Sequence, residues 1–361
     1  MAKAFPAFPQ DMSLPLHHSQ RFFASYVLGG VAWLLHVPAE DVFFPFVVLA
    51  ILGIVLAFHK ILDRLGLEPE KRVILLSFLI LNTYMFRYYL AIPWMISDVG
   101  FQLGLAVLLL GLLSESSGLT LAGLLTSALS KQTALLLIPG VMGWIWWEWR
   151  TVPPKVKVVQ CVGAAVSGTA VYQGTTWLVR GFSGPSLLTR HVTGLVTWMA
   201  TAFSPTEAMV FVARGLIGFA FPGALLLSLW GTRRLPAGWH RNRRLRCCLV
   251  LAGSICLQPI LAGPVNTGHS ISRLAMLAYA PVLVGLGSIL AETSLPSLFQ
   301  RRLAFLSAFS VAISSFHHFY SFLGISDVSR AGRFAAVYVA AAGLLFVGSL
   351  VLQHAENSER A

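Results

Sequence analysis

Residues 42–59 read VFFPFVVLAILGIVLAFH, an apolar run of 18 residues with no charged side chain. A helix needs about 20 apolar residues to cross the hydrocarbon core of a bilayer, and roughly 17 to 25 are observed. Seven further runs of this kind lie at 73–95, 156–179, 208–230, 245–262, 274–290, 303–325 and 334–352. The long apolar stretch 99–149 divides at polar residues 115–118 and 130–132 into three shorter spans. The sequence therefore predicts about eleven transmembrane helices.

The composition agrees with a polytopic membrane protein. Of 361 residues, 56% are hydrophobic and only 11% are charged, against about 25% charged in an ordinary soluble domain. Mean hydropathy is +0.74. These values exclude a soluble enzyme, a disordered chain and a secreted disulfide scaffold. We predict an all-α integral membrane protein.

The N-terminal part precedes the first predicted span. Residues 22–37 form a shorter apolar run between Arg21 and Pro38, which predicts a helix lying in the membrane interface. The first twenty residues lack the apolar segment of a signal peptide. We therefore expect an outer-face segment over 1–41, a transmembrane helical domain over 42–353 and a short cytoplasmic tail over 354–361.

The charge distribution predicts the orientation. Lys and Arg number 26 against 14 Asp and Glu, for a net charge of +12. Alternating the eleven spans places 16 of the basic residues on one side and 8 on the other, with Arg87 and Arg214 inside spans. Basic residues mark the cytoplasmic side. We expect a multi-pass protein of a bacterial plasma membrane, with its N-terminus outside, its C-terminus cytoplasmic and no nucleic-acid partner.

Arg87 and Arg214 are the first candidates for function, because a charge inside hydrocarbon is costly. Arg87 lies six residues before Pro93, or about 9 Å inside its span. A guanidinium group matches the geometry of phosphate, so the two arginines are candidate phosphate ligands. The alternative is that each side chain extends to the interface or pairs locally.

Further candidates lie on the predicted outer face. Asp98 begins a span, where it either caps the helix or takes part in a site. Lys131 lies in a tight turn between two short spans, where it either fills the turn or binds an anion. Arg190, His269 and Arg273 add polar groups that an ordinary solvated loop would also explain. Cysteine spacing predicts neither a disulfide framework nor a zinc site.

The order of four short motifs resembles the GT-C superfamily of polytopic membrane glycosyltransferases. The motifs are SQRFF at 19–23, KILDRLGL at 60–67, YYLAIP at 88–93 followed by Asp98, and ALSKQTALLLIP at 128–139. A late span from Arg273 to Pro281 is similar more loosely. The resemblance covers roughly residues 19–150. It differs in one respect, because the family has one more helix at its start, ending in an outer loop with an acidic base.

This resemblance implies transfer of a sugar from a polyprenyl-phosphate donor to an outer-face acceptor. It implies that Asp98 positions the acceptor or a divalent metal ion, Mg²⁺ or Mn²⁺. The phosphate contacts would be Lys131, Arg87, Arg214 and Arg273, with His269 and Arg190 as further candidates. Asp11 or Asp41 would be the base.

Two other function classes compete with a transferase. One is a non-catalytic membrane subunit, or a scaffold that binds lipid phosphate, on the same fold; its partners would be membrane lipids and another membrane protein. The other is a transporter, whose paired broken helices and symmetric halves are not evident in the sequence.

Overall fold

The computed structural model describes residues 2–7, 20–180, 205–267, 271–315 and 331–360. This part of the chain contains helices and no strand. The N-terminal half of the bundle consists of α2 (Phe22–Leu35), α3 (Ala39–Arg64), α4 (Pro69–Ile80), α5 (Phe86–Ala91), α6 (Ile96–Leu113), α7 (Ser117–Ser130), α8 (Leu137–Glu148) and α9 (Pro154–Val179). The C-terminal half consists of α11 (Pro205–Leu216), α12 (Ala220–Gly231), α13 (Arg243–Thr267), α14 (Ile271–Met276), α15 (Tyr279–Glu292), α16 (Ser297–Ser314) and α18 (Ala331–Arg360).

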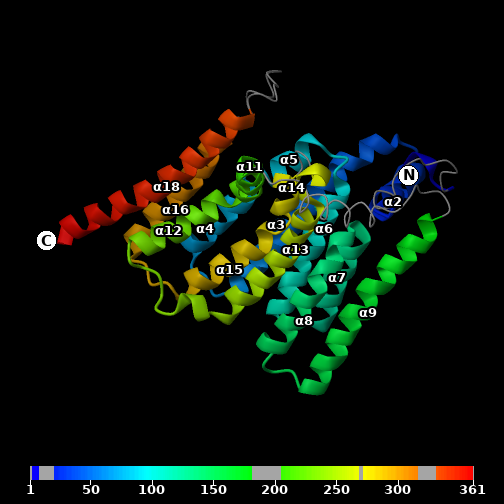
Figure 1. The fold of residues 1–361 in the computed structure, drawn as a ribbon, viewed down its shortest axis with the longest axis horizontal. Helices are drawn as coiled ribbons and strands as arrows, with labels where there is room; N and C mark the ends of the chain where they lie inside the picture. The colour runs from blue at the N-terminus through cyan, green and yellow to red at the C-terminus, as the bar shows by residue number, and fades with distance from the viewer. Residues whose placement is uncertain (1, 8–19, 181–204, 268–270, 316–330, 361) are drawn as a thin grey trace.

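The long helices lie side by side in one bundle (Figure 1). Helices α6 to α9 form one side of it, and α4, α12, α16 and α18 form the other. Between them, α3 packs on α6, and α13 packs on both α8 and α15. The buried apolar residues of all these helices form one continuous core.

Four helices among the described residues are long and apolar enough to cross a membrane. They are 39–64, 96–113, 209–231 and 335–358. The prediction of an all-helical chain is confirmed for the described residues, and several apolar helices are consistent with a membrane protein. The number of eleven spans stays a prediction. The predicted N-terminal helix is present as α2 and ends at His36, which adopts a left-handed backbone with φ 55°.

One predicted span is not a single helix. The apolar run 73–95 is divided, because α4 ends at Ile80 and the short α5 begins only at Phe86. In the turn between them, the Asn82 side chain accepts a hydrogen bond from the Tyr84 amide at 2.9 Å. This local bond gives the backbone an alternative to the helix. The prediction of one helix across 73–95 is therefore wrong.

One other predicted span is interrupted, because Leu277 and Ala278 separate α14 from α15. The helical stretch 209–231 is continuous, with a 3₁₀ turn at Ile217–Phe219 between α11 and α12. The Gly218 carbonyl of this 3₁₀ turn accepts a hydrogen bond from the Tyr338 hydroxyl at 3.1 Å, which satisfies a buried backbone group. These interruptions are not the paired broken helices in symmetric halves that a transporter would show, so the transporter alternative stays untested.

Candidate functional site

Asp98 lies at the centre of a buried ionic cluster where four parts of the chain meet. Lys131 donates to Asp98 Oδ1 at 2.5 Å, and Arg273 Nε lies 3.5 Å from Asp98 Oδ2. The Lys131 side chain is 0% exposed and that of Asp98 is 2% exposed. Arg21 interacts electrostatically with all three residues. We call Arg21, Asp98, Lys131 and Arg273 the Asp98 cluster.

The hairpin of α6 and α7 brings Asp98 and Lys131 together. Asp98 lies in the first turn of α6, and Lys131 directly follows the last residue of α7. The two helices pack with almost no side chain between them at Gly104 and Gly123. A Cβ atom on Gly104 would overlap the backbone of Ser127, and one on Gly123 would overlap the backbone of Leu108. Small residues allow this close approach, as in other membrane helix pairs.

The backbone changes direction at Lys131. Its φ of −159° and ψ of 135° are extended, between α7 and a 3₁₀ turn at Gln132–Leu136. Its amide still donates to the Ser127 carbonyl at 2.8 Å. Because α7 ends at Ser130, Lys131 lies at the same end of the hairpin as Asp98.

The segment before α2 contributes Arg21. Arg21 Nε donates to Gln132 Oε1 at 3.3 Å, next to Lys131. The preceding residue, Gln20, is buried and donates to Thr176 on α9 at 2.5 Å. These bonds connect the N-terminal segment to two other parts of the bundle. Burial lowers the pKa of the Arg21 guanidinium, and Asp98 opposes this effect.

Residues on α6 and directly before it contact Arg273 and the end of α14. Arg273 Nη1 lies 3.0 Å from the Met95 sulfur, just before α6. Gln102, one turn beyond Asp98, donates to the Met276 carbonyl at 3.0 Å where α14 ends. The interruption between α14 and α15 is therefore held against α6, next to the cluster.

The cluster carries more positive than negative charge. Three cations surround one carboxylate, which leaves a formal charge of +2. Asp98 Oδ2 and Arg273 Nε are buried and face each other as an ion pair at 3.5 Å, without a hydrogen bond to either atom in the described part of the chain. Charges removed from water are costly unless they are paired. The arrangement is suited to an anion that the three cations can share, and a phosphate fits arginine and lysine donors.

A divalent metal ion does not fit these residues. Mg²⁺ and Mn²⁺ prefer several oxygen ligands, whereas the one carboxylate of the cluster is already in contact with two cations. Among the residues that the structure describes, no group of three or more His, Cys, Asp or Glu side chains could hold a metal ion. The metal role of Asp98 stays a prediction, and we derive no step through a metal.

The other predicted site residues are placed as follows. Arg87 donates to the Ser315 carbonyl at 2.7 Å, in contact with the end of α16. Arg214 is exposed on α11, and Asp41 is exposed in the first turn of α3. In the described ranges, none of the three has a bond or ion pair with the Asp98 cluster. Asp11, Arg190 and His269 lie outside the described residues.

Arg21 is the site residue that the sequence candidates lacked. In the sequence it is one of the basic residues on the predicted outer side and part of the motif at 19–23. The signal that could have singled it out is its position directly before the interfacial helix, on the same predicted side as Asp98 and Lys131. Polar residues beside it, Gln20 and Gln132, are further signals of a buried site.

Comparisons with known proteins give no family. No protein-family model, characterised protein or solved structure matches this chain.

Proposed function

We propose that the chain binds the phosphate of a polyprenyl-phosphate-linked sugar at the Asp98 cluster and transfers the sugar to an acceptor on the outer face of the membrane. The observation that carries this proposal is the positive excess of three cations around one carboxylate, at one end of an apolar helical bundle. A lipid phosphate would supply the negative charge that the cluster lacks, and its polyprenyl chain would stay in the hydrocarbon beside the helices.

In this reaction the acceptor hydroxyl oxygen attacks the anomeric carbon of the sugar. The bond between that carbon and the phosphate oxygen breaks, and the polyprenyl phosphate leaves with the electron pair. Arg21, Lys131 and Arg273 would stabilise the negative charge that develops on the leaving phosphate. Asp98 would hold Lys131 and Arg273 in position. The acceptor proton passes to a base, for which Asp11 and Asp41 remain the candidates.

The proposed site belongs on the outer side of a bacterial plasma membrane, by the charge distribution. Lys131, Arg21 and Arg273 are three of the eight basic residues assigned to that side. The N-terminus would then lie outside and the C-terminus in the cytoplasm.

The ion pairs of Asp98 support a second candidate function. Both of its oxygens face cations, at 2.5 and 3.5 Å, so it does not serve as a free base. Within the described ranges, no second carboxylate lies within ion-pair distance of the three cations. This favours a scaffold or subunit that binds lipid phosphate without catalysis, together with a membrane protein partner.

Two measurements on the purified protein separate the candidates. The first is binding of polyprenyl phosphate, and the second is sugar transfer from a radiolabelled polyprenyl-phosphate sugar, with and without Mg²⁺. A transferase should show both, and a scaffold should show binding alone. Asp98→Asn and Lys131→Ala should lower both by tenfold or more, and Arg243→Gln, which changes an exposed arginine at the start of α13, should lower neither. Absence of binding, or retained activity in both cluster variants at normal expression, would refute the site.

A further inference from the structure

The turn that follows α7 joins three parts of the chain through consecutive side chains. Its first residue, Lys131, belongs to the Asp98 cluster. The next side chain, Gln132, accepts a hydrogen bond at Oε1 from Arg21 at 3.3 Å. The hydroxyl of Thr133 donates to Oε1 of Gln258 on α13. Two uncharged amide side chains, those of Gln132 and Gln258, therefore adjoin the turn that carries Lys131.

Both amides have N–H groups that the described residues do not use. In each glutamine the carbonyl oxygen is the bonded atom, and within the described ranges Nε2 has no hydrogen-bond partner. Each Nε2 carries two N–H donors. Both side chains are partly exposed, and neither nitrogen is enclosed. A ligand at the Asp98 cluster can therefore reach these donors.

A third amide close to the cluster is used differently. Gln20 is 5% exposed, and its Nε2 donates to the Thr176 hydroxyl at 2.5 Å. That hydroxyl in turn donates to the Tyr172 carbonyl at 2.7 Å. Gln20 thus serves the contact between the N-terminal segment and α9, whereas the free N–H groups of Gln132 and Gln258 serve no contact among the described residues.

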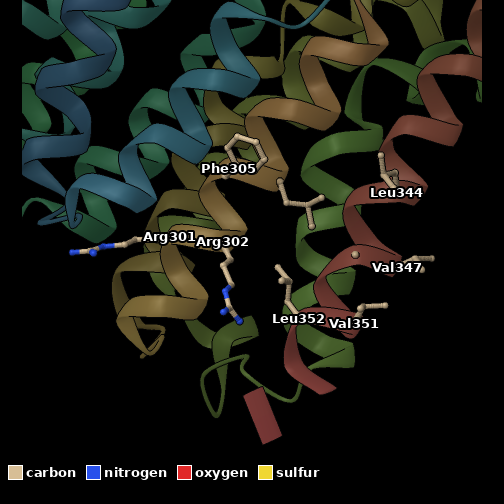
Figure 2. Close-up of a pocket in the computed structure, with 9 residues that line it drawn as sticks. Arg301, Arg302, Phe305, Leu344, Val347, Val351 and Leu352 are labelled. Atoms are coloured by element: carbon tan, nitrogen blue, oxygen red, sulfur yellow. The ribbon is translucent and has the colours of Figure 1, made fainter. Parts of the chain in front are cut away.

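The groove between α16 and α18 offers no comparable donors. It has a volume of about 750 Å³, and its walls are apolar, with Phe305 on one side and Leu344 and Val347 on the other (Figure 2). Arg301 lies 3.4 Å from Glu70 and extends away from the groove (Figure 2). None of the residues that line the groove has an amide or hydroxyl side chain. Recognition of sugar hydroxyl groups therefore belongs at the turn after α7.

Uncharged donors at this place match the chemistry of a sugar. In the proposed ligand the sugar is bonded directly to the phosphate, so side chains beside the three cations are the ones that reach its hydroxyl groups. A carboxylate there would pair with the cations and compete with the phosphate, and a fourth cation would add to their repulsion. An amide supplies N–H donors to hydroxyl oxygens without changing the charge of the cluster.

We propose that Gln132 and Gln258 bind hydroxyl groups of the sugar in the polyprenyl-phosphate-linked donor, each through Nε2. This inference rests on the proposed function and adds the residues that recognise the sugar. The two glutamines determine specificity and transfer no proton. The assignment applies to a transferase and to a scaffold alike, because both bind the same lipid.

Equilibrium binding to the purified full-length protein tests this assignment. Two kinds of lipid with the same polyprenyl chain and the same single negative charge are compared. In one the phosphate carries mannose, glucose, galactose or arabinose, and in the other it carries a methyl group. We expect at least one of the four sugars to be bound tenfold or more tightly than the methyl lipid.

The affinity ratio of the best sugar lipid to the methyl lipid is then measured in variants. Gln132→Leu and Gln258→Leu should each lower this ratio about fivefold, which corresponds to ~1 kcal/mol for one hydrogen bond. Gln132→Leu also removes the acceptor of Arg21, but any effect on the phosphate cancels in the ratio. Gln173→Leu is the matched control, because Gln173 is exposed on α9, and it should leave the ratio unchanged.

The outcomes separate this assignment from the proposed function. If neither polyprenyl phosphate nor any of these lipids binds, the proposed function fails and this inference with it. If the methyl lipid binds and no sugar adds affinity, the sugar assignment alone is overturned. An unchanged ratio in both glutamine variants, or an equal fall in Gln173→Leu, would also overturn it. If Gln258→Leu does not fold, Gln258→Met, which keeps an unbranched side chain without N–H groups, takes its place.

Discussion

Lys131 donates to Asp98 at 2.5 Å although 33 positions separate them in the sequence, and both side chains are buried. The contact closes the open end of the α6–α7 hairpin. It also holds a lysine beside two arginines, Arg21 and Arg273, which would otherwise repel it. Among the described residues, Asp98 is thus the one carboxylate in ion-pair contact with cations of this cluster.

Removing the negative charge should destabilise the protein more than removing the lysine. Asp98→Asn leaves the buried Lys131 and the half-buried Arg21 and Arg273 without a carboxylate, and breaking a buried ion pair such as Asp98–Lys131 costs about 3 to 5 kcal/mol. Lys131→Met removes one of the repelling cations, so its loss should be smaller. Thermal unfolding in detergent checks this order.

The double variant Asp98→Asn/Lys131→Met is the control for that order. It should be more stable than Asp98→Asn alone, because it restores part of the charge balance. Equal unfolding temperatures for the wild type and Asp98→Asn would show that the pair does not form as the structure describes.

The sequence predicted part of this site and not the rest, for a physical reason. Asp98, Lys131 and Arg273 were singled out because alternating spans place them on one side of the membrane, and the structure brings these three together. Arg21 was overlooked because nothing local shows that the segment before α2 folds back onto Gln132. Arg87 and Arg214 were chosen for their depth in predicted spans, but depth does not tell which way a side chain faces.

The interrupted helices were missed for a similar reason. The run 73–95 is apolar enough to predict one helix, and its turn includes a hydrogen bond from the Tyr84 amide to the Asn82 side chain and another from the Met85 amide to the Asn82 carbonyl. The interruption is tolerated because buried partners elsewhere in the bundle satisfy its polar groups, as Ser315 does for the Leu81 carbonyl at 2.7 Å. Such long-range partners cannot be predicted from the pattern of apolar residues along the sequence.

Arg21 should contribute more to phosphate binding than Arg214. Arg21→Gln removes a cation that interacts with the whole Asp98 cluster, whereas Arg214 is exposed on α11. A hydrogen bond to a charged group contributes about 1.5 to 3 kcal/mol, so Arg21→Gln should weaken binding of polyprenyl phosphate at least about tenfold. Arg214→Gln should change it less than about twofold, which is under ~0.5 kcal/mol. Binding isotherms of the two purified variants measure the difference, and equal losses would contradict the structural assignment.

The contact of α6 and α7 should be sensitive to a single methyl group at Gly104. Gly104→Ala places a Cβ against the backbone of Ser127, which cannot move as a side chain end can. Overpacking of this kind costs about 1 to 3 kcal/mol. It should also disturb the Asp98–Lys131 pair, because Ser127 lies one turn before Lys131 and accepts a hydrogen bond from its amide. The unfolding temperature and the binding of polyprenyl phosphate should therefore fall together.

Gly163→Ala is the matched control for Gly104→Ala. Gly163 lies inside α9 with nothing within 4 Å of its added Cβ. Alanine there should be neutral or stabilising by about 0.5 to 1 kcal/mol, because it favours the helix. A loss in Gly163→Ala as large as in Gly104→Ala would show that the effect does not come from the α6–α7 contact.

The predicted orientation places Arg180 and Arg243 on opposite sides of the membrane, and both side chains are exposed. Single cysteines can be introduced at each position after the four native cysteines are replaced by alanine; three of those are buried, so the unsubstituted protein should itself react slowly. In intact cells, a membrane-impermeant maleimide should label Arg180→Cys at once and Arg243→Cys only after lysis. The reverse pattern would place the Asp98 cluster on the cytoplasmic side and exclude an outer-face acceptor. Labelling of both positions from one side would instead contradict the alternation of spans between them, because α9 ends at Val179 and α13 begins at Arg243.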